Sequence, residues 1–157
     1  MIATADILNA RILIVDDQDS NIQLLERILA NAGYTSVSRS KDANEVCELQ
    51  RRNPFDLILL DIEMPGVGFS GFQVMDCLRE IAPDSPLPVI VITAHPDHKL
   101  HALQKGAMDF ISKPFELPVM LARIRNMLEV SLLHQKLLKR IETLENQAGH
   151  PAQKEQP

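Results

Sequence analysis

The chain contains five short runs of aliphatic residues, separated by longer and more polar segments. Three of these runs are almost purely apolar, and such runs predict strands that are buried on both faces of a sheet. The other two runs are shorter, and we interpret them as further strands. The five predicted strands are residues 11–17, 34–38, 55–61, 88–93 and 108–112.

Between the strands, apolar residues recur every three or four positions, which is typical of amphipathic helices. Ser20 and Gln23 have the spacing of a capping box, which predicts the start of a helix. Gly33 and Gly106 each follow a helical pattern and are suited to end it. The predicted helices are residues 20–32, 42–52, 72–81, 95–105 and a long segment from 115 to about 147.

This alternation of strands and helices predicts an α/β fold, in which an open, doubly wound parallel sheet has helices on both faces. The crossovers between parallel strands are expected to be right-handed. In such a sheet the ligand site lies beyond the carboxyl ends of the strands, at the switch point of the strand order. The polar residues at those ends are therefore the candidates for function.

Polar residues occupy the carboxyl ends of four predicted strands. Asp16 and Asp17 close the first strand, Asp61 closes the third, Thr93 closes the fourth, and Lys113 follows the fifth. Three carboxylates that lie close together repel one another, and a proton or a bound cation relieves the repulsion. A few oxygen ligands that are open to solvent suit Mg²⁺, which takes phosphate oxygens as further ligands.

The same edge of the sheet suits a phosphoryl group. The Thr93 hydroxyl and the Lys113 ammonium would surround one carboxylate, and phosphoryl transfer requires mainly positioning and charge neutralisation from a protein. Asp61 is then the candidate nucleophile. A single Asp at a strand end is usually a solvated loop residue, so it is the conjunction of these residues at one edge that favours a functional site.

Four segments resemble the receiver domain of two-component response regulators. They are residues 12–17, 57–61 with Met64-Pro65, 92–94, and 106–115. The resemblance covers about residues 10 to 128 and implies a flavodoxin-like fold with strand order 2-1-3-4-5. It implies that Asp61 accepts a phosphoryl group from a histidine kinase, a phosphotransfer protein or a small phosphodonor.

The resemblance also implies roles for the neighbouring residues. Asp17 and Asp61 would bind Mg²⁺ together with the backbone carbonyl of Glu63, and Asp16 would assist through water. Residues at the positions of Glu63 and His95 tune the access of hydrolytic water in the family.

On the phosphoryl side, the resemblance implies that Thr93 and Lys113 bind phosphoryl oxygens after transfer. Phe110 resembles the aromatic residue that turns inward when Thr93 moves toward the phosphate. The Lys113–Pro114 peptide bond is expected to be cis. The loop at residues 64–71 departs from the family pattern, because it is about two residues longer and lacks the usual Asp.

The end of the chain is more apolar than a receiver domain requires. Leu117, Leu121, Ile124 and Leu128 are expected to pack on the sheet, whereas a second stripe continues beyond them. A helix from residue 115 to 147 would be ~50 Å long at ~1.5 Å per residue, so it must project from a domain of ~35 Å. The second stripe is Val130, Leu133, Leu137, Ile141 and Leu144.

A projecting stripe of large aliphatic residues is an aggregation hazard unless it is paired. A two-stranded coiled coil is the simplest cover, and we expect a homodimer through the receiver face and this helix. The alternatives are a frayed amphipathic tail and an interface for an output domain, since the helix resembles linkers that join receivers to cyclic-nucleotide enzymes or kinases. We predict a receiver domain at residues 10–128, a projecting helix at 129–148 and a disordered tail at 149–157.

Two further groups of residues have ordinary interpretations. His95, His98 and His101 recur every three residues, which spreads them around the start of a helix and favours a solvated helix over a metal site. Cys47 and Cys77 are interpreted as small, partly buried helix residues and not as a redox pair.

Composition excludes several classes of protein. The chain has 157 residues with a formal net charge of -5, so direct binding to nucleic acid phosphates is not expected. No window approaches the ~18 consecutive apolar residues of a membrane helix. Residues 1–10 lack the basic start of a secretory signal, so we expect a cytoplasmic protein.

Two rival functions are weaker. Asp61-Ile62-Glu63 approaches the Asp-x-Asp motif of haloacid dehalogenase phosphatases, but the second acid is Glu and 157 residues leave no room for a cap domain. A structural domain with an inactive site is weakened because every site position holds a chemically competent residue. We therefore predict an autocatalytic phosphoryl acceptor and not a turnover enzyme.

Overall fold

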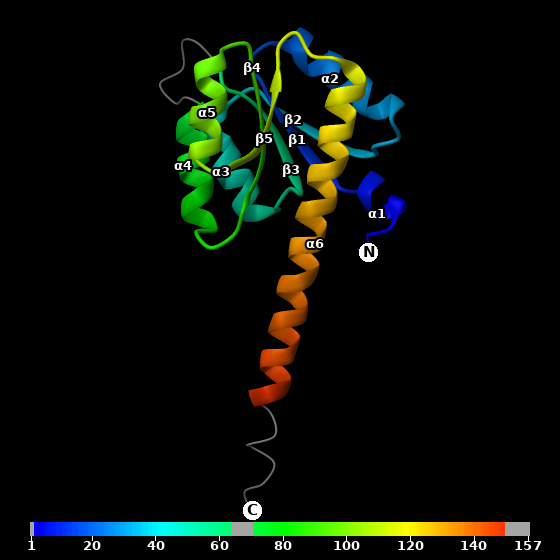
Figure 1. Ribbon diagram of the computed structural model, residues 1–157, viewed down its shortest axis with the longest axis vertical. Coiled ribbons are helices and arrows are strands. Elements are labelled where there is room, and N and C mark those ends of the chain that lie inside the picture. The colour runs from blue at the N-terminus through cyan, green and yellow to red at the C-terminus, as the bar shows by residue number, and fades with distance from the viewer. Residues whose placement is uncertain (1, 64–70, 150–157) are drawn as a thin grey trace, which may run out of the picture.

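The computed structural model describes residues 2–63 and 71–149. At its centre lies one parallel sheet of five strands in the order β2-β1-β3-β4-β5 (Figure 1). This arrangement confirms the predicted flavodoxin-like fold and its strand order. The strands are β1 (Arg11–Val15), β2 (Ser36–Ser40), β3 (Leu57–Asp61), β4 (Leu87–Thr93) and β5 (Ala107–Ser112).

Helices cover both faces of the sheet. One face is packed by the first, second and last helices, and the other by the three helices between β2 and β5 (Figure 1). The helices are α1 (Thr4–Leu8), α2 (Asp19–Asn31), α3 (Ala43–Arg52), α4 (Gly71–Ile81), α5 (Pro96–Gln104) and α6 (Leu117–Gly149).

The central strands are buried on both faces, as their apolar runs predict. In β3, Leu57 and Leu59 pack with α2 and α6, whereas Ile58 and Leu60 pack with α3 and α4. Each of these four side chains is fully buried, and burial of such a side chain stabilises the fold by about 1.5–3 kcal/mol. The sheet is therefore a rigid platform for the residues at its carboxyl edge.

Three local predictions differ from the structure. The short helix α1 was not expected; Ile7 anchors it in the core. The strand predicted at residues 34–38 lies two residues later, as β2. The capping box at Ser20 and Gln23 is wrong, because α2 begins at Asp19 after Gln18, whose N–H donates to Asp16 Oδ1 at 2.9 Å. The aspartate thus fixes the start of the helix before Ser20 is reached.

Both predicted helix-ending glycines are confirmed. Gly33 and Gly106 have φ values of 99° and 103°, a left-handed conformation that glycine adopts without steric cost.

The long helix α6 leaves the domain and continues well beyond it (Figure 1). Its buried face consists of Met120, Ile124, Leu128 and Ser131, while Leu117, which was expected on this face, is 46% exposed. The helix extends through Gly149, the first residue of the predicted tail. The rest of that tail and residues 64–70 of the predicted long loop lie outside the described residues.

Most of the second apolar stripe is exposed, as predicted, but Leu133 is only partly so. Leu132 still packs against the core, and further along, the helix has no sheet to cover. The exposed large aliphatic residues beyond Ser131 are Leu137, Leu138, Ile141 and Leu144, at 46–59%.

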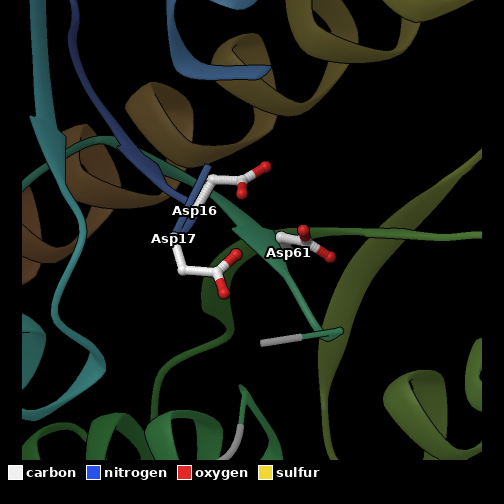
Figure 2. A group of neighbouring side chains, drawn as sticks. All are labelled: Asp16, Asp17 and Asp61. Carbon is white, nitrogen blue, oxygen red and sulfur yellow. The ribbon is translucent and has the colours of Figure 1, made fainter. Parts of the chain in front are cut away.

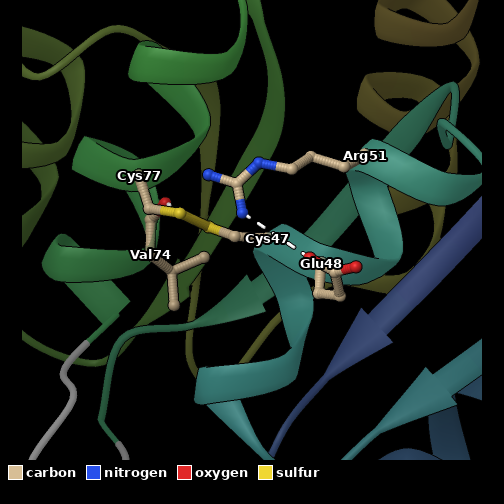
Figure 3. The surroundings of a disulfide bond; sticks show 5 residues. All are labelled: Cys47, Glu48, Arg51, Val74 and Cys77. Carbon is tan, nitrogen blue, oxygen red and sulfur yellow. Dashed lines mark hydrogen bonds and ion pairs between the residues drawn. A yellow bond between two sulfur atoms is a disulfide. The ribbon is translucent and has the colours of Figure 1, made fainter.

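Cys47 and Cys77 are buried or partly buried helix residues, as interpreted, but the prediction that they do not form a pair is wrong. Cys47 in α3 and Cys77 in α4 are joined by a disulfide, with their Cα atoms 6.3 Å apart (Figure 3). The two helices pack side by side on the same face of the sheet, which brings together residues that are 30 positions apart in the sequence. No helix among the described residues is long and apolar enough to cross a membrane.

Candidate functional site

Three aspartates meet at the carboxyl edge of the sheet (Figure 2). Asp16 and Asp17 follow β1 directly, and Asp61 is the last residue of β3, which pairs with β1. One carboxylate oxygen from each residue lies within 4.8 Å of the others. Asp16 and Asp61 are each only 3% exposed, so water screens their mutual repulsion poorly.

Backbone N–H groups hold two of the carboxylates, but not every carboxylate oxygen has a hydrogen-bond donor. Asp16 Oδ1 accepts the N–H of Gln18, and Asp61 Oδ1 accepts the N–H of Glu63, both at 2.9 Å. Asp17 Oδ1 is buried and accepts no hydrogen bond from any described residue. A buried oxygen without a donor, beside two further carboxylates, fits a hard divalent cation such as Mg²⁺.

Lys113 brings a positive charge to the same group. It follows β5, and its peptide bond to Pro114 is cis, as expected. Its Nζ lies 3.1 Å from Asp61 Oδ2, and its backbone N–H donates to the Thr93 carbonyl at 3.0 Å. The lysine therefore reaches Asp61 on β3 from the end of β5, across β4.

The ionised form of Asp61 is disfavoured despite this lysine. The pKa of Asp61 is raised from 3.8 to about 6, chiefly by burial and in part by the nearby charge of Asp16. The Glu63 N–H and the Lys113 ammonium lower this pKa without offsetting the burial. The buried carboxyl therefore gains stability from either a proton or a further cation.

Thr93 lies at the end of β4 and is fully buried. Its hydroxyl donates to Glu63 Oε1 at 2.6 Å, and the N–H of Ala94 donates to the same oxygen at 2.9 Å. Burial opposes the charge on Glu63, but these hydrogen bonds outweigh it and hold the pKa of Glu63 below its usual value. Glu63, whose backbone carbonyl is the predicted cation ligand, thus also brings its side chain into the site.

Phe110 lies apart from the acidic group, half-buried on β5. The Lys99 ammonium and the Arg123 guanidinium each lie 5.4 Å from the centre of its ring. The three histidines in and before α5 do not share one point: His95 and His98 lie 3.7 and 4.0 Å from Glu63 Oε1, whereas His101 packs edge-on against Phe72.

The geometry unites the sequence segments that carried the family resemblance. A model of the response regulator receiver domain matches residues 12–125. The chain belongs to the response regulator receiver family. Response regulator PleD of Caulobacter vibrioides is 36% identical over 135 residues, which are 85% of this chain and 29% of PleD. A probable cyclic di-GMP phosphodiesterase of Vibrio cholerae is 29% identical over 144 residues, which are 90% of this chain and 32% of that protein.

Solved structures support the same assignment. A putative response regulator from Chloroflexus aurantiacus superposes with a TM-score of 0.69 and 29% identity, covering 77% of this chain and 98% of that one. The chain spans only about a third of the length of the two relatives named above. The alignments with these two relatives extend over 135 and 144 residues, whereas the receiver model matches 114 residues of this chain.

Most predicted site residues of the receiver domain lie together. Asp16, Asp17, Asp61 and Lys113 form one group, and Thr93 joins it through Glu63. The contact between Glu63 and Thr93 was missed. The position of Glu63, two residues after Asp61, was the only signal, and it does not tell where a long, flexible side chain points.

Proposed function

We propose that this receiver domain is a Mg²⁺-dependent phosphoryl acceptor in which Asp61 takes a phosphoryl group from a histidine kinase, a phosphotransfer protein or a small phosphodonor. The observation that carries the proposal is the group of Asp16, Asp17 and Asp61, with its buried, unpaired oxygen and the Lys113 ammonium 3.1 Å from Asp61. Membership of the receiver family supports it.

Asp16, Asp17, Asp61 and the backbone carbonyl of Glu63 would hold the cation. When bound, Mg²⁺ offsets the negative charge of the carboxylates and of the incoming phosphoryl oxygens. A carboxylate oxygen of Asp61 forms a bond to phosphorus as the bond from phosphorus to the donor's nitrogen or oxygen breaks. The donor leaves with the electron pair of that bond.

Thr93 and Lys113 have the chemistry to bind the transferred group. The Lys113 ammonium donates to Asp61 Oδ2. After transfer, it would donate to a phosphoryl oxygen and stabilise the negative charge there. The Thr93 hydroxyl already donates to an anionic oxygen, that of Glu63. Asp61 is consumed stoichiometrically in this scheme, so the domain acts as a switch and not as a turnover enzyme.

The output is proposed to run through α6 in a homodimer. Leu137, Ile141, Leu144 and Ala148 are spaced four, three and four residues apart, which is the a/d spacing of a coiled coil. In a parallel pair, Arg140 would face the partner's Glu145 across the seam. Neither residue has an ion-pair partner among the described residues, so both charges are available.

The receiver face would contribute to the same dimer. Leu100 and Leu103 on α5 and Val119 on α6 are 61%, 41% and 46% exposed, and Lys99 of α5 and Arg123 of α6 both contact the Phe110 ring. A movement of Phe110 would alter this surface. We propose that phosphorylation changes how this face packs against the partner subunit, and thereby changes the geometry of α6. The helix would join the receiver to an output module.

Intact-mass measurement tests the phosphoryl acceptor. The chain is incubated with acetyl phosphate, with Mg²⁺ or with a chelator, beside Asp61→Asn and the exposed matched control Asp84→Asn. We expect one phosphoryl group on the wild type and on the control, only when Mg²⁺ is present, and none on Asp61→Asn. Turnover of a phosphomonoester without stable labelling would favour a phosphatase instead.

A further inference from the structure

The side chain of Glu63 occupies a small anion-binding site next to Asp61. A single oxygen, Oε1, accepts both the Thr93 hydroxyl at 2.6 Å and the Ala94 N–H at 2.9 Å. Two donors that converge on one oxygen form an oxyanion site, and here the oxyanion is a carboxylate of the chain itself. Among the described residues, this carboxylate accepts hydrogen bonds from no other group.

The Glu63 carboxylate and the Asp61 carboxylate are neighbours of the same ammonium group. The Lys113 ammonium lies 3.1 Å from Asp61 Oδ2 and 4.0 Å from Glu63 Oε2, so it stands between the two carboxylates. The Glu63 N–H donates to Asp61 Oδ1 at 2.9 Å, which keeps the two residues together. A phosphoryl oxygen and the Glu63 carboxylate would therefore compete for the same donors.

We propose that Glu63 is a positioning residue that acts as an internal competitor: its carboxylate fills the phosphoryl-oxygen site of the unmodified domain and must leave before Thr93 and Ala94 can bind the incoming group. The inference deepens the proposed function and rests on it. It assigns to the Glu63 side chain a role distinct from that of its backbone carbonyl, which is the proposed cation ligand.

Two histidines at the start of α5 offer the displaced Glu63 carboxylate an alternative position. Glu63 Oε1 is 3.7 Å from His95 Nε2 and 4.0 Å from His98 Nδ1. His95 is the N-cap of α5, and His98 lies in its first turn, where the positive end of the helix dipole favours a negative charge. Displacement would thus move a charge from Thr93 to the start of α5, the helix that flanks the proposed dimer face.

Competition predicts tighter binding when Glu63 is shortened. Glu63→Ala, Glu63→Gln and the exposed control Glu80→Gln are compared with the wild type. Two quantities are measured: the affinity for beryllofluoride in the presence of Mg²⁺, by fluorine NMR, and the rate of labelling by acetyl phosphate, by intact mass. A hydrogen-bonded competitor of ordinary strength predicts about five- to tenfold tighter beryllofluoride binding and faster labelling in Glu63→Ala.

The remaining variants separate competition from a structural effect. Glu63→Gln keeps an acceptor oxygen but loses the charge, so its affinity is expected between those of the wild type and Glu63→Ala, while Glu80→Gln matches the wild type. Mg²⁺ affinity, measured alone, is expected to change little, because the backbone carbonyl remains. A purely structural role for Glu63 would weaken the binding of both Mg²⁺ and beryllofluoride.

The outcomes distinguish this proposal from the proposed function. Unchanged, weaker or undetectable beryllofluoride binding in Glu63→Ala overturns the competition, whatever the labelling rate. If beryllofluoride binds more tightly to Glu63→Ala but no chain is labelled on Asp61, competition stands and the phosphoryl-acceptor function fails.

Discussion

Asp56 and Asp61 stand at opposite ends of the buried strand β3. Asp61 ends the strand within the acidic group, and Asp56 precedes it at the point where α6 leaves the domain. Asp56 Oδ1 accepts the side chain of Gln135 and its carbonyl accepts the hydroxyl of Ser131, both at 2.8 Å. One rigid strand therefore joins the candidate phosphoryl acceptor to the anchor of the projecting helix.

Removing the Asp56 anchor is expected to loosen α6 without harming the site. Asp56→Ala loses the bond to Gln135 and a second one from the Arg11 N–H at 2.8 Å, which predicts a loss of about 1–3 kcal/mol in the free energy of unfolding. Gln135→Ala should lose about 0.5–1.5 kcal/mol. Urea denaturation measures both, and labelling of Asp61 should persist. Two variants as stable as the wild type would show that the anchor contributes nothing.

A methyl group at Gly71 is expected to disturb the acceptor strand. A Cβ there would lie 2.8 Å from Ile62 Cδ1 and 2.9 Å from Ile62 Cα, so either the backbone or α4 must shift. Gly71→Ala should destabilise the fold by about 1–3 kcal/mol and slow labelling of Asp61. Gly149→Ala, where nothing lies within 4 Å, is the matched control and should not destabilise it. Equal unfolding curves for the two variants would contradict the close approach.

The raised pKa of Asp61 predicts a pH dependence of stability without metal. Because the folded chain holds the proton more tightly, its stability should fall as pH rises from 3.8 through about 6. Asp61→Asn lacks this titration. Its free energy of unfolding should therefore rise relative to that of the wild type across the same range, by about 3 kcal/mol at most. Urea titrations in a chelator measure the difference. A constant difference across these pH values would mean that the folded and unfolded pKa values are equal.

Breaking the apolar stripe of α6 is expected to separate the dimer. Ile141→Asp places a charge on the seam, so sedimentation should show a monomer at concentrations where the wild type is dimeric. Asn146→Asp adds the same charge away from the seam and should leave the dimer intact. A wild type that is monomeric at every concentration, with and without beryllofluoride, would contradict the proposed pairing.

The Cys47–Cys77 disulfide predicts a stability that depends on reductant. It closes a loop of 30 residues, so reduction should lower the free energy of unfolding by about 3–4 kcal/mol in the chain-entropy model. The double variant Cys47→Ser, Cys77→Ser should be insensitive to reductant. Alkylation of the denatured, unreduced chain checks the pairing, and two reactive thiols in the wild type would refute it.

Much of the fold could be predicted because its causes are local. The apolar runs of β1, β3 and β4 required burial on both faces, and Gly33 and Gly106 ended helices through their own backbone freedom. The start of α2 was missed because it depends on the Asp16 side chain, which binds the N–H of Gln18. Helix α1 was missed because a segment of five residues has too little periodicity to detect.

The site was predictable where the backbone alone positions a residue. Asp16, Asp17 and Asp61 follow parallel strands that end at one edge, so strand order was enough to bring them together. Glu63 and the Cys47–Cys77 pair were not predictable, because their partners depend on side-chain direction and on the packing of two helices.

The central claim is that Asp61 itself carries the phosphoryl group, and site mapping tests it most directly. The chain is treated with acetyl phosphate and Mg²⁺, the acyl phosphate is reduced with borohydride, and the peptides are sequenced by mass spectrometry. Conversion of Asp61 to homoserine, with the other aspartates unchanged, is the predicted result. Labelling with Asp61 unconverted, or conversion at Asp16 or Asp17 instead, would contradict the account.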